Sequence, residues 1–319
     1  MVAIERRHYE IVELLVSKGA DLKVKISENS NGSIHVAIAS RRLEVVKLLI
    51  SKDKTLLKST NEHGSTPLLL AAYNGELEMM DWLLECGSSF DEKDFLGRNA
   101  LLLAATMKNQ KIEVFSYLLE HGLSIASTDS SGYTVMHQLA YANALQAIRF
   151  FKNKGADLKS EGKDGKTPLD LVDKNNTQTV YLLVTLELFE HVKGGTIHKV
   201  VEMLKEYPQH MEARDDRGCT PLLSAVSYGK IELLKKLISL NADKNARNIE
   251  GSGIKSSGNT ALLWAAYEGH LDIIKYLLEN DLSYIDETND AGMNVLLCAS
   301  NNGHISIVEW LIKNTRVDT

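Results

Sequence analysis

Short apolar runs at helical spacing recur along this chain and alternate with polar turns. Residues 215–245 show the pattern in full. A polar turn ends at Gly218 and is followed by Thr220-Pro221, where a proline in the first turn of a helix loses no hydrogen bond. One apolar run comes next, and after Gly229 a second run has leucine and isoleucine at helical spacing. The pattern predicts a turn followed by two short helices.

The same pattern returns along most of the chain, and each copy begins at a turn glycine. These glycines are Gly64, Gly97, Gly132, Gly165, Gly218, Gly258 and Gly292. The first four follow one another at intervals of 33, 35 and 33 residues. One copy alone cannot bury its apolar face, so we expect neighbouring copies to stack on each other.

A period of about 33 residues with a turn and two helices is typical of ankyrin repeats. The chain resembles an ankyrin-repeat protein over nearly its whole length, with about nine repeats that are degenerate in places. This resemblance implies an all-α fold, a solenoid of helix–turn–helix pairs with β-hairpin fingers. His35 and His137 stand where the family has the histidine of its Thr-Pro-Leu-His run. There the ring is expected to form a hydrogen bond with the backbone of the neighbouring turn.

The regular spacing breaks between Gly165 and Gly218, which are 53 residues apart, fewer than two repeats need. The chain passes from a second helix near 179–183 almost directly into a new apolar run from Leu186, without a finger. We therefore expect two consecutive stacks. Residues 1–183 hold a half repeat plus five repeats, and residues 184–319 hold four repeats, the last one incomplete. Either one continuous helix or a sharp kink carries the chain between them.

Two further features concern the chain ends and one finger. Both ends fall inside a repeat, so the chain either begins on a truncated capping repeat or is a segment taken from a longer protein, which the incomplete last repeat also favours. The Gly/Ser-rich residues 252–257 lengthen the finger before Gly258 and predict a mobile fingertip.

Composition limits the classes of partner. The chain has 319 residues and a net charge of −6, which argues against nucleic-acid or anionic-membrane binding, because both need a basic surface. No apolar run is long enough to span a membrane, and the charged N-terminus lacks a signal-peptide core. Cys86, Cys219 and Cys298 are scattered, which fits neither a disulfide framework nor a metal site. We expect a monomer in a reducing compartment, the cytoplasm.

The sequence contains no recognisable catalytic or cofactor motif. A Gly-rich phosphate loop, a nucleophile elbow and a paired-histidine zinc motif are all missing, so no catalytic, metal or cofactor residue is predicted. His191, His198 and His210 have no helix-face spacing and are expected at the surface. Cys219 follows a turn glycine and is expected to be exposed, with a reactive thiol as the alternative use.

The resemblance implies a concave groove, lined by the fingers and the first helices, in which partners bind. Candidate partner-binding residues lie near the turn glycines and at the ends of the first helices: Tyr73, Asn74, Phe95, Arg98, Tyr133, Tyr141, Arg217, Tyr228, Tyr267, Glu268 and Asn301. Tyrosine and arginine are enriched in binding hot spots. The tyrosines at the first-helix ends form either an aromatic strip or rings that pack on the neighbouring helix and keep only the hydroxyl in water. Trp264, one turn inside its helix, is expected in the core.

The function that these features favour is recognition of another protein. We expect a non-enzymatic interaction module or scaffold that holds a partner protein in the groove, without a cofactor. An alternative is the substrate-targeting region of a longer enzyme. Another is part of a bacterial effector that acts in the cytoplasm of a eukaryotic host.

Overall fold

The structure is a computed structural model that describes residues 1–25, 31–107, 110–173, 175–249 and 257–315. Most of the predicted mobile fingertip at 252–257 lies outside these residues. Contacts between Cα atoms divide the chain into two compact units, Met1–Val180 and Tyr181–Thr319, which we call the first unit and the second unit. The expected division into two stacks at residues 183 and 184 stays a prediction.

Most helices come in consecutive pairs, as the sequence pattern predicts. In the first unit the pairs are α1 (Val2–Glu5) with α2 (Tyr9–Ser17), α3 (Ser33–Ala39) with α4 (Leu43–Lys52), α5 (Pro67–Asn74) with α6 (Leu77–Glu85), α7 (Ala100–Ala105) with α8 (Ile112–Glu120), and α9 (Val135–Tyr141) with α10 (Leu145–Asn153). In the second unit α12 (Ile197–Glu206) is followed by the pairs α13 (Pro221–Ser227) with α14 (Ile231–Ser239), α15 (Ala261–Glu268) with α16 (Leu271–Glu279), and α17 (Val295–Asn301) with α18 (Ile305–Asn314). Short 3-10 helices are η1 (Lys54–Lys58), η2 (Leu169–Leu171) and η3 (Pro208–His210).

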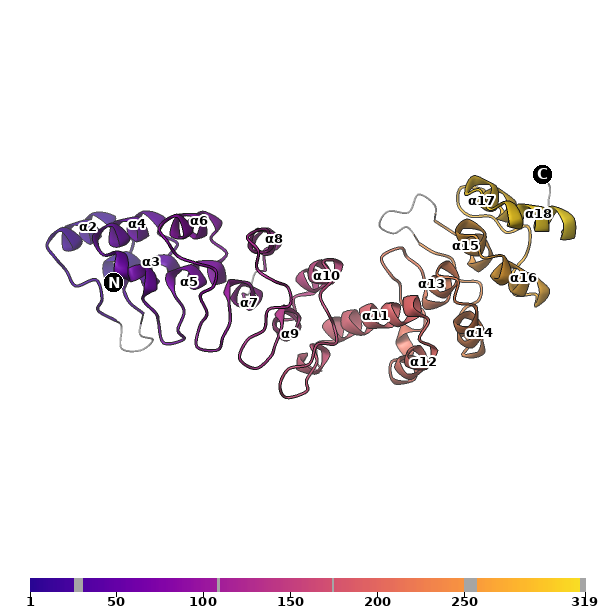
Figure 1. Ribbon diagram of the computed structural model, residues 1–319, viewed down its shortest axis with the longest axis horizontal. Helices are drawn as coiled ribbons and strands as arrows, with labels where there is room; N and C mark the ends of the chain where they lie inside the picture. The colour runs from indigo at the N-terminus through magenta and orange to yellow at the C-terminus, as the bar shows by residue number, and fades with distance from the viewer. Residues whose placement is uncertain (26–30, 108–109, 174, 250–256, 316–319) are drawn as a thin grey trace. The chain divides into compact units, whose positions relative to one another are not determined.

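The first helix of each pair packs on the first helices of its neighbours. In the first unit α3 contacts α5, α5 contacts α7, and α7 contacts α9 (Figure 1). In the second unit α13 contacts α15, and α15 contacts α17. This packing confirms the predicted all-α repeat solenoid.

Local sequence determines where the first helices begin and why they are buried. Thr220 precedes Pro221, and its hydroxyl accepts a hydrogen bond from the Leu223 N–H at 3.3 Å. This bond satisfies one of the N–H groups that a helix start leaves without a partner. A first helix has neighbours on both sides, and all 6 residues of α7 are buried. Helices that are apolar on every side are buried in this way.

The fingers are hydrogen-bonded turns that lie against one another. Phe95 N–H donates to the His63 carbonyl at 2.9 Å, and Ser130 N–H donates to the Leu96 carbonyl at 2.8 Å. Among the described residues, the isolated bridge between Lys25 and Gly32 is the β-pairing present. The predicted β-hairpins are therefore reduced to turns, because each finger offers its neighbour single backbone bonds rather than a ladder.

The segment between the two expected stacks departs from the repeat. Where the sixth repeat should have its first helix, the chain forms only η2. Residues expected to hold a second helix and the next first helix form one element, α11 (Thr177–Gly194). Of the two alternatives for this segment, the structure has the continuous helix.

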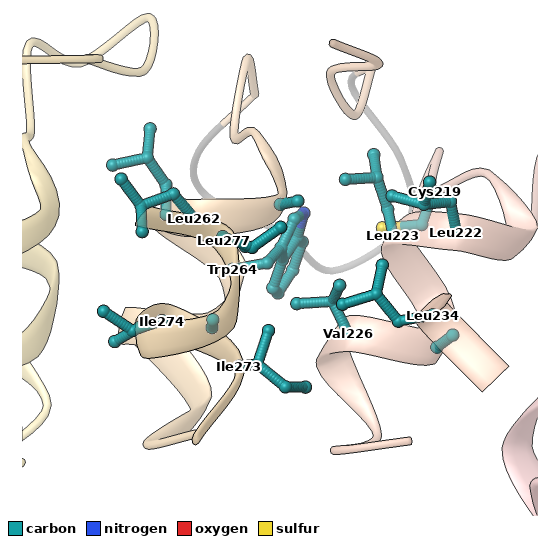
Figure 2. Packing of buried hydrophobic residues seen from close by; sticks show 14 of the residues in the cluster. Cys219, Leu222, Leu223, Val226, Leu234, Leu262, Trp264, Ile273, Ile274 and Leu277 are labelled. Atoms are coloured by element: carbon teal, nitrogen blue, oxygen red, sulfur yellow. The ribbon is translucent and has the colours of Figure 1, made fainter. Parts of the chain in front are cut away.

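The core of the second unit lies between successive helix pairs. Figure 2 shows the indole of Trp264 from α15 lying toward Val226 of α13 and Ile273 of α16. Only 2% of Trp264 is exposed, which confirms the prediction that it belongs to the core. Leu223 and Leu234 fill the same cluster from α13 and α14.

Candidate functional site

Three candidate residues of the first unit expose large rings. Phe95 lies on the finger before α7, and Tyr73 and Tyr141 lie at the ends of α5 and α9. Their exposed fractions are 72% for Phe95, 42% for Tyr73 and 73% for Tyr141. Leu96, next to Phe95, is also exposed. We call Tyr73, Phe95, Leu96 and Tyr141 the exposed apolar set.

Phe95 is exposed but held in place by the preceding finger. Its N–H donates to the His63 carbonyl at 2.9 Å. Its ring lies over Gly64, where an added Cβ would come within 2.5 Å of the Phe95 Cδ1 atom. Asp94, directly before it, is buried and accepts from the Leu96 N–H at 3.0 Å. The ring is therefore presented to solvent on an ordered turn, so a partner pays little entropy to use it.

Asn74 and Arg98 have internal partners. The Asn74 amide donates to the Ile38 carbonyl of the preceding repeat at 3.3 Å. The Arg98 guanidinium forms an ion pair with the buried Asp94 carboxylate at 2.7 Å. Both side chains therefore stabilise the contacts within and between repeats, whether or not a partner also binds them.

Tyr133 is likewise engaged within the first unit. Its ring stacks on His137 with centroids 4.9 Å apart. Its hydroxyl donates to the Asp164 carboxylate on the next finger at 2.8 Å. This hydrogen bond raises the pKa of Tyr133 and lowers the pKa of Asp164.

In the second unit, Arg217 is the centre of a network of candidate residues. Its Cζ atom lies 4.8 Å from the centroid of the Tyr228 ring. Its Nη1 donates to the Ser227 hydroxyl at 2.8 Å, and that hydroxyl lies 3.4 Å from a carboxylate oxygen of Glu268. The guanidinium also pairs with Asp215 at 3.3 Å. We call Asp215, Arg217, Ser227, Tyr228 and Glu268 the Arg217 network.

The remaining candidates of the second unit lie at first-helix ends. Tyr267 is exposed, and its ring meets the edge of Trp264 at a centroid distance of 5.6 Å. Asn301 is exposed at the end of α17. The tyrosines at the first-helix ends were expected either to form an exposed aromatic strip or to pack their rings on a neighbour, and the two units differ in this respect. Tyr73 and Tyr141 expose their rings, whereas Tyr228 lies against Arg217 and Tyr267 meets Trp264.

The two family-position histidines connect repeats, as the resemblance implies. His35 Nε2 lies 3.2 Å from the Ser65 carbonyl, and His137 Nε2 lies 3.0 Å from the Lys166 carbonyl. Both rings are fully buried, and burial lowers the pKa of His35. These contacts confirm the expected hydrogen bonds to the neighbouring turns.

A second pair of histidines, not predicted from the sequence, has a similar role. His270 Nε2 lies 3.0 Å from the Ser227 carbonyl, and His304 Nε2 lies 2.9 Å from the Tyr267 carbonyl. Each ring thus reaches back to the first-helix end of the preceding repeat. The signal was present, because both histidines directly follow a glycine and precede a second helix.

Two expectations about titratable side chains are wrong. Cys219 is fully buried rather than exposed, because it faces the packed first helices, and burial raises the pKa of its thiol to about 12. A reactive thiol at this position is not supported, because the thiolate is the nucleophile. His210 is also buried, since its ring stacks on Tyr181 with centroids 4.3 Å apart. Burial lowers the pKa of His210.

The part of the chain that the structure describes has neither a cluster of metal ligands nor a membrane-spanning helix. Its His, Cys, Asp and Glu residues form no group of three or more that could hold a metal ion. None of its helices combines the length and apolar character that crossing a membrane requires.

Comparison with known families matches most of the chain to ankyrin repeats. A model described as "Ankyrin repeats (3 copies)" matches residues 34–129 and 69–161. One described as "Ankyrin repeats (many copies)" matches residues 1–50 and 256–312, and a third, "Ankyrin repeat", matches residues 217–249. These matches cover both units.

Similar curated proteins also contain ankyrin repeats by name or share part of this sequence. Ankyrin repeat protein OPG189 of Variola virus is 27% identical over 216 residues, which cover 65% of this chain and 37% of that protein. Ankyrin repeat and SAM domain-containing protein 6 of Rattus norvegicus is 34% identical over 92 residues, which cover 29% of this chain and 10% of that protein. Neurogenic locus notch homolog protein 1 of Danio rerio is 26% identical over 170 residues, which cover 53% of this chain and 6% of that protein. The chain thus spans well under two thirds of these relatives.

Proposed function

The chain belongs to the ankyrin-repeat family, and we propose that it is a non-enzymatic recognition module that binds a partner protein at the exposed apolar set of the first unit. Ankyrin repeats are generally protein–protein interaction modules, and this chain shares their fold and sequence pattern. The specific partner surface is our inference from the side chains that this chain presents.

The observation that carries the proposal is the presentation of Phe95. Phe95 as a residue is 72% exposed, which leaves a large apolar area in water. Its backbone is bound to His63 and its ring lies over Gly64, so the side chain is ordered before a partner arrives. Aromatic residues, phenylalanine included, are enriched in protein interfaces, and a few anchor side chains contribute most of the binding energy.

The two units differ in what they offer a partner. In the Arg217 network, cation, ring, hydroxyl and carboxylate already contact one another. A partner would have to replace these contacts to bind there. Among the residues that the structure describes, the side chains of the exposed apolar set have no hydrogen bond, ion pair or ring contact that a partner would have to replace, so we place the main binding surface on the first unit.

We also propose that the module works as a monomer in the cytoplasm. Cys86, Cys219 and Cys298 are all free thiols, which fits a reducing compartment. The partner is an apolar segment of another protein rather than a nucleic acid, because the surface that we propose carries rings and a leucine instead of cations.

Affinity capture from a eukaryotic cell lysate, followed by mass spectrometry, tests this proposal. The bait is the full chain, and the variant is Phe95→Ala/Tyr141→Ala. Tyr284→Ala is the matched control, because Tyr284 is 70% exposed but lies outside the exposed apolar set. We expect a protein captured by the wild type and the control to be lost from the double variant, with unchanged circular dichroism. Equal capture by all three chains would contradict the proposed surface.

A further inference from the structure

Most connections between the two helices of a repeat contain one residue with left-handed backbone. In most repeats it is a small or amide residue: Gly75, Asn143, Gly195, Gly229, Gly269 and Gly303. In the first two repeats it is an arginine, with φ of 65° at Arg7 and 56° at Arg41. Bulky residues rarely adopt this conformation, because it brings Cβ close to the backbone. The two arginines with left-handed backbone are therefore unusual.

Arg41 forms an ion pair with the following repeat. Its Nε lies 3.0 Å from a carboxylate oxygen of Glu76. Glu76 directly precedes α6, just as Arg42 directly precedes α4. The left-handed residue between the helices of one repeat therefore forms an ion pair with the residue that precedes the second helix of the next repeat.

In the first repeat, the same two positions hold two cations instead of a cation and an anion. Arg7 stands at the left-handed position, and the helix-start residue of the next repeat is Arg42. Two cations thus occupy the positions that an arginine and a glutamate fill one repeat later. Both line a cavity of about 570 Å³ together with His8, Arg41 and Glu44.

No anion of the described residues neutralises this pair. Neither guanidinium has a hydrogen bond or ion pair with any residue that the structure describes, while Arg41 is bound to Glu76. Glu44, the acidic residue that lines the cavity, pairs instead with Lys47 at 3.1 Å. The starts of α2 and α4 also lack a side-chain cap, which leaves their first N–H groups without that partner.

We propose that this cavity binds a phosphate group between the guanidinium groups of Arg7 and Arg42. A planar guanidinium offers paired N–H donors that match phosphate oxygens, and two of them complement a dianion. The uncapped helix starts at the same cavity add donors that favour an anion. The phosphate is either inorganic phosphate or the phosphate ester of a phosphorylated serine. This site is independent of the exposed apolar set.

Isothermal titration calorimetry at constant ionic strength tests the site on the full chain. The probes are inorganic phosphate and N-acetyl-phosphoserine amide, each compared with N-acetyl-serine amide. We expect both phosphates to bind and the unphosphorylated amide not to bind. Tighter binding of phosphoserine amide assigns the site to a phosphorylated protein, and equal binding assigns it to free phosphate.

Arg42→Glu is the decisive variant. It places a carboxylate opposite Arg7, as Glu76 is placed opposite Arg41 one repeat later. It should fold with an equal or higher melting temperature, yet bind phosphate at least about tenfold more weakly. Arg7→Gln should weaken binding in the same direction and changes only an exposed side chain.

Lys18→Gln/Lys52→Gln is the matched control, since it removes two exposed cations from the opposite ends of α2 and α4. It should bind phosphate as the wild type does. Undetectable phosphate binding to the wild type would overturn the site. Equal loss of affinity in the control and in Arg42→Glu would overturn it too, because general charge would then explain the binding.

Discussion

At the scale of single residues, the turn glycines carry the most demanding constraint. Gly218 has a φ of 71°, and an added Cβ would lie 2.3 Å from the Ile249 carbonyl oxygen of the next finger. The position therefore needs glycine twice, once for its left-handed backbone and once for the close approach of a neighbouring chain segment. Gly64, Gly97 and Gly258 combine left-handed backbone and a close contact in the same way, whereas Gly165 and Gly292 need glycine for the backbone alone.

Gly218→Ala should destabilise the chain by about 2–4 kcal/mol, since both the backbone and the contact resist a Cβ. Gly292→Ala is the control, because its φ is 73° but no atom lies within 4 Å of the added Cβ. It should cost only about 1 kcal/mol. Urea unfolding measures both values. Equal losses of unfolding free energy would show that the Ile249 contact has no effect.

The three thiols should differ in reactivity because they differ in burial. Cys219 and Cys298 are buried, and burial raises the pKa of their thiols to about 12 and about 11. Cys86 is partly exposed. At pH 8 in the native state, iodoacetamide should modify Cys86 first and leave the other two unmodified, whereas all three react in denaturant. Peptide mass spectrometry locates the modification, and early labelling of Cys219 would contradict its buried position.

At the scale of elements, neighbouring helix pairs are joined by histidine side chains that reach from repeat to repeat. His35 and His137 do this at the finger side of first helices, and His270 and His304 do it at the start of second helices. Each ring joins a backbone carbonyl of an adjacent repeat. A buried carbonyl that lost this partner would cost about 1–3 kcal/mol.

Stability should fall in mild acid because two of the buried histidines resist protonation. Burial lowers the pKa of His35 and of His210 from the ordinary value of 6.5. The unfolded chain therefore takes up protons first, so folding free energy is lost as the pH falls below 6.5 toward the folded pKa values.

The measurement is the melting temperature at pH 7.5 and at pH 5.0. His35→Gln and His210→Gln should each reduce the drop in melting temperature between these pH values, because each removes one of the groups. An unchanged drop in both variants would show that other groups control the acid sensitivity.

Most elements were predictable because their signals are local. Turn glycines, proline at the first turn and helical spacing all lie within one repeat, so they predict most pairs from α3 with α4 onward, although the sixth repeat forms only η2 after Pro168. The single helix α11 was harder to predict, because the loss of a finger removes the turn that would separate two helices. The β-hairpins expected in the fingers are turns in the structure, and the sequence contains no signal that distinguishes single backbone bonds between fingers from a ladder.

The site was only partly predictable, because exposure depends on contacts from other repeats. Phe95 and Arg98 lie three positions apart on one finger, yet one ring is open to solvent and one guanidinium is bound to Asp94. Cys219 follows a turn residue but faces the core. No rule within one repeat separates these outcomes.

At the scale of the whole molecule, the two units have the same fold but different surfaces. The first unit presents the exposed apolar set and the arginine-lined cavity, which lie on different elements of that unit. The second unit has most of its candidate residues engaged in the Arg217 network. We therefore expect partner recognition to depend mainly on the first unit and stability of the second unit to depend on Arg217.

We propose that Phe95 is an ordered anchor for a protein partner. The most direct test is the dissociation constant of a captured partner, measured by calorimetry for the wild type, Phe95→Ala and Tyr284→Ala. Phe95→Ala should weaken binding at least about tenfold, as expected for a hot-spot ring, while its melting temperature and the affinity of Tyr284→Ala stay at wild-type values. A dissociation constant for Phe95→Ala within about twofold of the wild type would contradict the claim.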